Sequence, residues 1–250
     1  MKTEEYHLMS RIEKTHWWFI GKRFLVDTTL RGLLSHGPRS QTHLDVGCGT
    51  GMVLDLLQGF GKAFGVELSS EALSYLRPAH GHQIALADAA QAVPFRDNTF
   101  SIITCLDVLE HLDDDDSALR EAYRVCAPGG HMILTVPALR FLWGPHDEAL
   151  HHRRRYTRSG LLRALSRCKW QVARCSYYNT ILFFPILAVR ILNRCRQRGV
   201  RPRSDLSLAV PRWLNAALSR LFCTEIRLLR FLDFPFGVSI LAVLKKPAIL

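Results

Sequence analysis

Glycines at alternate positions follow a short apolar run and its acid, in the order Leu44-Asp45-Val46-Gly47-Cys48-Gly49-Thr50-Gly51. Glycine has no Cβ, so such a segment can turn sharply out of a strand and let a ligand lie against its backbone. A helix-forming segment begins at Met52, and the N–H groups at a helix start favour polar or anionic ligand groups. The residues predict a ligand-binding turn between a strand and a helix.

Carboxylates and histidines recur at defined places after this loop. Glu67 stands 20 residues after Gly47, the spacing at which an acid can bind both hydroxyls of a ribose in a nucleotide-binding fold. Asp88 ends the next apolar run, and His111 follows the one after that. A second histidine, His151, lies in a later basic segment, and either imidazole could act as a general base.

The elements that must position these residues are short apolar runs, which we predict to be strands. They precede Gly47 and cover residues 62–66, 84–87, 100–105, 131–136, 170–175 and 238–244. Helical patterns lie between the runs, so we predict an α/β fold with a mostly parallel sheet. Ligands of such sheets bind at the carboxyl ends of the strands, where the glycine loop, Glu67 and Asp88 fall.

These residues together resemble the class I S-adenosylmethionine (SAM) dependent methyltransferases over roughly residues 40 to 140. The segment Cys105-Leu106-Asp107-Val108-Leu109-Glu110-His111 is similar to the methyltransferase-11 and quinone-biosynthesis branch of that family. The segment His16-Trp17-Trp18-Phe19 resembles an HWWF-type subgroup linked to glycan or lipid metabolism. The resemblance implies SAM as cofactor and a Rossmann-like sheet of seven strands whose last strand is antiparallel.

The resemblance also assigns the amino-acid end of SAM to the glycine loop. The loop residues implied to contact it are Gly47, Cys48, Gly49 and Gly51. Asp45 would orient this loop, or bind the SAM ammonium group through water.

The adenosine part of SAM is assigned in the same way. Glu67 would bind the ribose hydroxyls, and Leu68 would lie against the adenine. Asp88 would accept a hydrogen bond from the adenine amino group, helped by the Ala89 N–H. Leu106 would pack beside the methionine part.

Other interpretations of single residues stay open. An NAD(P)-binding fold also has a strand, a glycine loop, a helix and a later acid, but its usual loop is G-x-G-x-x-G. Met52 occupies the position of that third glycine, and the glycines here run G-x-G-x-G, which favours SAM. Taken alone, Asp45 could cap a loop, Asp88 could belong to a turn, and His111 could simply begin a helix.

We expect one methyltransferase domain over 1–250, since a chain of 250 residues with 48% hydrophobic residues can bury one sizeable core. Residues 1–40 would form a helical N-terminal lid, in which Trp17 and Trp18 either contact substrate or simply pack. Residues 41–175 would form the SAM-binding core and 236–250 the last strand. Residues 176–235 replace the short hairpin of the family, and we expect them to form a basic, apolar, helical cap.

Charge is divided unevenly along the chain, with a net of −6 over residues 1–150 and +17 over residues 151–250. The basic part also holds nine consecutive apolar residues from Ile181 to Val189 and a helix-like pattern from Leu206 to Leu232. Neither reaches the about 20 apolar residues of a transmembrane helix. Apolar runs bordered by arginine suit a helix in an anionic membrane interface or a hydrophobic substrate channel, although they could also pack on the sheet. Nucleic acid is another partner for such charge, but no RNA-binding module is recognisable.

Cysteine usage and the N-terminus point to the cytoplasm. The seven cysteines include no C-x-x-C pair, and no histidine stands at ligand spacing, so we expect neither a metal site nor a disulfide framework. Residues 1–10 are charged and lack an apolar signal-peptide region. We expect a cytoplasmic protein, with peripheral attachment to the inner face of a membrane; the oligomeric state is not encoded in these patterns.

The expected chemistry follows from SAM, whose sulfonium makes its methyl group electrophilic, so the protein mainly aligns a nucleophile and excludes water. His111 or His151 would serve as base, and Arg155 with Tyr156 would bind a phosphate or carboxylate of the substrate. The leading hypothesis is methyl transfer to an oxygen or carbon of a lipid-like or membrane-presented acceptor. The alternatives are methylation of RNA or another polyanion, and a non-catalytic SAM-binding scaffold.

Overall fold

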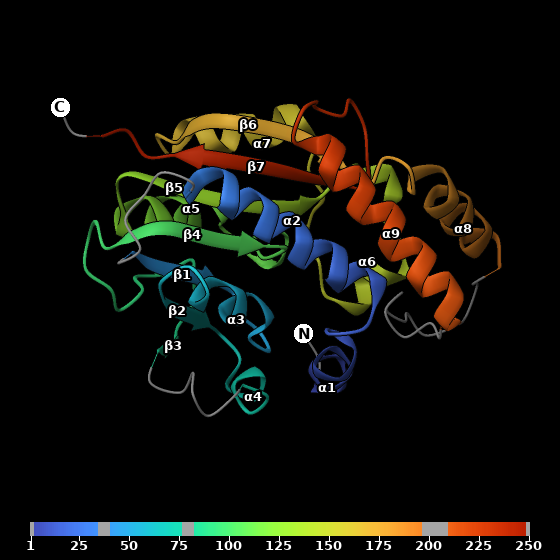
Figure 1. Ribbon diagram of the computed structural model, residues 1–250, viewed down its shortest axis with the longest axis horizontal. Coiled ribbons are helices and arrows are strands. Elements are labelled where there is room, and N and C mark those ends of the chain that lie inside the picture. The colour runs from blue at the N-terminus through green and yellow to red at the C-terminus, as the bar shows by residue number, and fades with distance from the viewer. Residues whose placement is uncertain (1–2, 35–40, 77–82, 197–209, 249–250) are drawn as a thin grey trace.

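The computed structural model describes residues 3–34, 41–76, 83–196 and 210–248. One sheet of seven strands has the order β3-β2-β1-β4-β5-β7-β6 (Figure 1). The strands are β1 (Thr42–Val46), β2 (Lys62–Glu67), β3 (Ile84–Leu86), β4 (Phe100–Leu106), β5 (Cys126–Pro137), β6 (Gln171–Tyr178) and β7 (Ser239–Lys245). The first five strands are parallel, whereas β7 is antiparallel to both β5 and β6. This arrangement confirms the predicted Rossmann-like sheet with an antiparallel last strand.

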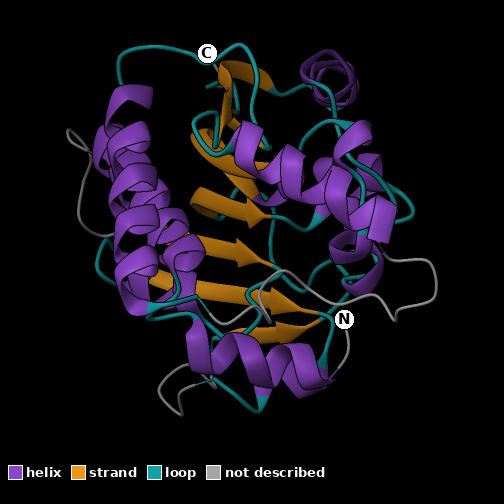
Figure 2. Cartoon of the chain, turned by 90° about the vertical axis from the view of Figure 1, so that its right-hand side faces the viewer, coloured by secondary structure: helices purple, strands orange, loops and turns teal. Residues whose placement is uncertain are grey.

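The central strands are apolar on both faces because helices cover both (Figure 2). In β7, Ile240, Ala242 and Leu244 belong to one core cluster, whereas Leu241 and Val243 belong to the other. The first cluster includes residues of α5 (Asp115–Val125) and α7 (Arg158–Arg167). The second includes residues of α2 (Trp17–Leu34), α3 (Met52–Gln58) and α9 (Arg212–Leu229). Successive side chains of a strand therefore enter different cores.

The N-terminal segment and the insertion pack together, although they lie about 200 residues apart. The Asn215 side chain of α9 accepts a hydrogen bond from the Trp17 N–H at 2.8 Å and donates one to the Thr15 carbonyl at 2.8 Å. The Phe222 ring lies 5.8 Å from that of Trp18 and is stacked 6.0 Å from that of Tyr178. We call α1 (Thr3–Ile12) and α2 the lid, and α8 (Phe183–Arg196) and α9 the cap. The lid and the cap therefore contact each other through α2 and α9, which share one core cluster on one face of the sheet.

The cap is the insertion expected between the sixth and seventh strands. The sixth strand continues to Tyr178, so the cap begins slightly later than the boundary at 176. Arg198, Arg201, Arg203 and Leu206 lie outside the described residues. Within the described ranges, none of the helices combines the length and apolarity needed to cross a bilayer.

Candidate active site

The glycine loop lies where the strand order reverses, between β1 and its neighbours β2 and β4. Gly47 and Gly49 have φ angles of 71° and 52°, a left-handed region that L side chains rarely adopt. A Cβ on Gly47 would lie 2.5 Å from Cγ2 of Val108, whereas one on Gly49 would meet no atom within 4 Å. The loop therefore needs glycine, and at Gly49 its backbone faces open space.

Glu67 ties this loop to the end of β2. Its carboxylate accepts hydrogen bonds from the N–H groups of Gly49 at 2.8 Å and of Leu68 and Ser69 at 3.0 Å. The residue is buried yet lines the cavity described below. Its position suits the predicted ribose contact, and its three backbone bonds show that it also fixes the loop.

The other predicted cofactor residues lie along the same strand ends. Asp45 is buried, and the Thr104 hydroxyl donates a hydrogen bond of 2.6 Å to it. Burial raises the pKa of Asp45 to about 7. Asp88 accepts a hydrogen bond from the Ala90 N–H at 2.9 Å, and Leu106 ends β4.

A single cavity of about 800 Å³ joins these residues, a size typical of sites for small molecules. Thirteen of the sixteen predicted site residues line it: Trp17, Trp18, Asp45, Gly47, Cys48, Gly49, Glu67, Leu68, Asp88, Ala89, Leu106, His111 and Arg155. The cavity size, the exposed backbone at Gly49 and the carboxylate of Glu67 fit SAM.

Three predicted site residues lie outside the cavity lining, and a fourth, Arg155, lines the cavity but is already paired. Gly51 is buried at the N-terminal end of α3 and is absent from the cavity lining. His151 is exposed outside the lining, whereas its neighbour His152 faces inward. Tyr156 is also outside the lining, and its hydroxyl bonds to Asp115 at 2.6 Å. Arg155 reaches the lining but is paired with Asp147 at 2.8 Å.

Three basic side chains contact the carboxylate of Asp147, which belongs to α6 (Pro145–Ala149). Its carboxylate lies 2.9 Å from Nδ1 of His152, 2.8 Å from Nε of Arg155 and 3.1 Å from Nη1 of Arg190. Burial alone would raise the pKa of Asp147, but the contacts with His152 and Arg155 hold it below its usual range. Since Arg190 belongs to α8, this buried cluster also fastens the cap to the core.

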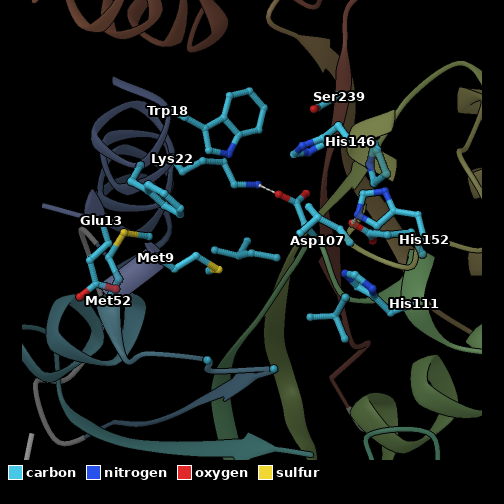
Figure 3. A pocket seen from close by; sticks show the side chains of 18 of the residues that line it. Met9, Glu13, Trp18, Lys22, Met52, Asp107, His111, His146, His152 and Ser239 are labelled. Atoms are coloured by element: carbon cyan, nitrogen blue, oxygen red, sulfur yellow. Dashed lines mark hydrogen bonds and ion pairs between the residues drawn. The ribbon is translucent and has the colours of Figure 1, made fainter. Parts of the chain in front are cut away.

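A buried lysine that the sequence analysis missed lies at the centre of the site. Nζ of Lys22, on α2, donates to Asp107 at 2.6 Å (Figure 3). It also donates to Thr135 at 2.7 Å and to the Tyr178 hydroxyl at 3.1 Å. Burial would lower the pKa of Lys22, but the Asp107 charge raises it above its usual range. Asp107 follows β4 with a φ of 55°, so the lid is fastened to the strand end where ligands bind.

Glu110 and His111 of η2 (Leu109–His111) meet His152 beside this pair. One ligand atom from each lies within 4.8 Å of the others, and these residue types suit a divalent cation. Glu110 is fully buried, and among the residues that the structure describes neither of its carboxylate oxygens has a hydrogen-bond partner. This group could not be predicted from the sequence, because His152 comes 41 residues after His111.

Residues 44–134 match the family described as "Methyltransferase domain". A ubiquinone biosynthesis O-methyltransferase of Pseudomonas paraeruginosa is 31% identical over 109 residues, covering 40% of this chain and 46% of that protein. An uncharacterised methyltransferase of Schizosaccharomyces pombe is 31% identical over 137 residues, covering 49% of this chain and 48% of that protein. The chain thus spans about half the length of these relatives.

Solved structures agree on the fold. A putative methyltransferase of Bacillus halodurans is similar with a TM-score of 0.57 at 22% identity, covering 88% of this chain and 100% of that one. The putative methyltransferase bound to the Trm112 activator of Haloferax volcanii gives a TM-score of 0.58 at 16% identity, covering 96% and 92%. The match and the glycine loop thus identify residues 44–134 as a methyltransferase domain, for which SAM is the cofactor, and the sheet has the fold of these solved structures.

Proposed function

We propose that this protein transfers the methyl group of SAM to an oxygen or carbon nucleophile of a lipid-like acceptor presented at a membrane. The observation that carries the proposal is the contrast within one cavity. The glycine loop and Glu67 line one part of it, and the wall supplied by the cap is apolar except for Arg190, which is paired with Asp147. The apolar residues of that wall lie in or just before α8 and α9: Leu182, Pro185, Ile186, Val189, Val210, Leu214 and Leu218.

His111 supports deprotonation of a hydroxyl acceptor. It lines the cavity directly after the β4 end, and burial followed by the neighbouring His152 lowers its pKa to about 4. The imidazole is therefore neutral at pH 7 and can accept a proton. SAM supplies the electrophilic methyl group when it is bound, while Trp17 and Trp18 of the lid cover the cavity and exclude water.

The outer surface of the cap supports membrane presentation. Ile181, Phe184 and Ile191 stand at helical spacing in and before α8 and are 42%, 65% and 49% exposed. Phe141, 52% exposed, packs against Phe183 of the same helix. Because residues 151–250 carry a net charge of +17, this apolar surface belongs to the half of the chain that an anionic membrane attracts.

Methyl-labelled SAM tests the proposal. The purified protein is incubated with it and a cell extract containing membranes, and the label is then separated into lipid, nucleic acid, protein and small-molecule fractions. We expect label in the organic phase that disappears with Glu67→Ala, because that variant loses the carboxylate beside the glycine loop. Label confined to nucleic acid, protein or water-soluble products would overturn the lipid acceptor.

A further inference from the structure

Helix α1 has a row of side chains that faces the cavity at the end where the cofactor is expected. Tyr6, Met9 and Glu13 all line the cavity, and positions three and four apart lie on the same face of a helix. Glu13 follows the last residue of α1 but continues its turn, since its N–H donates to the Met9 carbonyl at 2.8 Å. Figure 3 shows Met9 and Glu13 beside Met52, across the cavity from Asp107 and the histidines.

This row touches both loops that would hold SAM. The Thr50 hydroxyl donates a hydrogen bond to the Glu13 carboxylate, and Thr50 follows Gly49, whose N–H is held by Glu67. At the other end of the row, Tyr6 is buried, and burial followed by the Glu67 charge raises the pKa of its phenol. Helix α1 therefore spans from the glycine loop to the end of β2.

We propose that α1 forms part of the wall of the cofactor site and that Glu13 binds the ammonium group of SAM. The inference rests on the SAM-binding part of the proposed function and is independent of the acceptor. Glu13 lies against the glycine loop, where the amino-acid end of the cofactor is expected, and it brings a negative charge to that end.

The other carboxylates of the cavity are less suited to this role. Glu67 ends β2 and Asp88 follows β3, where the adenosine part of SAM is expected. Asp107 lies across the cavity from Met9 and Glu13 (Figure 3). Asp45 lies beneath the loop and is 3% exposed, and its raised pKa of about 7 means that it is only partly ionised at neutral pH. SAM carries two positive groups, an ammonium and a sulfonium, and one negative carboxylate. A negatively charged side chain from the lid therefore supplies charge complementarity that the glycine loop lacks.

Two ligands that share the adenosine and the thioether distinguish a contact between Glu13 and the ammonium group from a general effect of Glu13 on closure of the lid. S-adenosylhomocysteine has the amino-acid end, and 5′-methylthioadenosine lacks it. With Glu13→Gln, we expect calorimetry to show about tenfold weaker binding of S-adenosylhomocysteine and of SAM, the loss of one charge-assisted hydrogen bond. The affinity for 5′-methylthioadenosine should be unchanged. Glu148→Gln is the matched control, since Glu148 is exposed and outside the cavity lining, and it should bind all three ligands like the wild type.

Unchanged affinity of Glu13→Gln for S-adenosylhomocysteine would overturn the proposal. Equal weakening of both thioethers would also overturn it, because Glu13 would then act only by holding α1. Hydrogen exchange of the wild-type protein gives a test without a variant. The amides of residues 9–13 should be protected more by S-adenosylhomocysteine than by 5′-methylthioadenosine, and equal protection would contradict the ammonium contact. None of these readouts depends on the acceptor or on turnover, so failure of the lipid proposal would leave them unaffected.

Discussion

Two glycines of α2 should respond oppositely to the same substitution. A Cβ added to Gly21 would lie 2.0 Å from Cδ1 of Phe222 on α9, whereas one added to Gly32 would meet no atom of the described residues within 4 Å. Alanine stabilises a helix interior by roughly 0.5–1 kcal/mol relative to glycine. Forcing extra atoms into a packed contact costs about 1–3 kcal/mol. Phe222 is 1% exposed and held among Trp17, Trp18 and Tyr178, so its ring has little room to move.

We therefore expect Gly21→Ala to lower the free energy of unfolding by about 1–3 kcal/mol. Gly32→Ala should raise it by up to roughly 1 kcal/mol. Urea denaturation followed by circular dichroism measures both. Combining Gly21→Ala with Phe222→Leu should restore part of the loss relative to the sum of the single effects, because the smaller side chain vacates the clash. Gly21→Ala as stable as Gly32→Ala would refute the contact between the lid and the cap.

Three further predictions concern the core, the base and the cap. Asp147→Asn should cost about 3–5 kcal/mol in urea unfolding, because it removes the buried carboxylate charge that both Arg155 and Arg190 contact. Asp116→Asn, at an exposed ion pair, should cost at most about 1 kcal/mol, and equal losses would contradict the cluster's role. Methyl transfer to a hydroxyl acceptor should increase as pH rises through about 4, where His111 loses its proton. His111→Gln should lower kcat at least tenfold, which corresponds to about 1.4 kcal/mol. A variant with wild-type kcat would exclude His111 as the base. Phe184→Ser should reduce flotation with phosphatidylglycerol vesicles at high salt, and undiminished flotation would exclude insertion of this ring.

Much of the sheet could be predicted from the sequence because its information is local. Each strand is an apolar run ending in a polar residue or a turn, and the observed strands overlap all seven predicted ones. The glycine loop, Glu67 and Asp88 could be placed together because parallel strands bring their carboxyl ends to one edge. The two core faces likewise follow from alternation along strands such as β7.

The parts that could not be predicted depend on contacts between distant segments. Lys22 and Asp107 are 85 positions apart, and a lysine inside an aromatic-rich helix carries no sign that it will be buried. Apolar spacing indicated a helical pattern in the cap, but not that Asn215 would accept a hydrogen bond from the Trp17 N–H of the lid. The choice between His151 and His152 is a matter of local backbone: His151 takes a φ of 57°, and the chain turns its neighbour inward.

The most direct test of methyl transfer to a lipid uses purified protein, trideuteromethyl SAM and a protein-free lipid extract, with mass spectrometry of the organic phase. Our account predicts a lipid species that gains one trideuteromethyl group with the wild-type protein, and no such species with Glu67→Ala. The product would also identify the acceptor atom by fragmentation. An unlabelled lipid phase, with SAM bound and label recovered on a water-soluble molecule, would contradict the lipid acceptor.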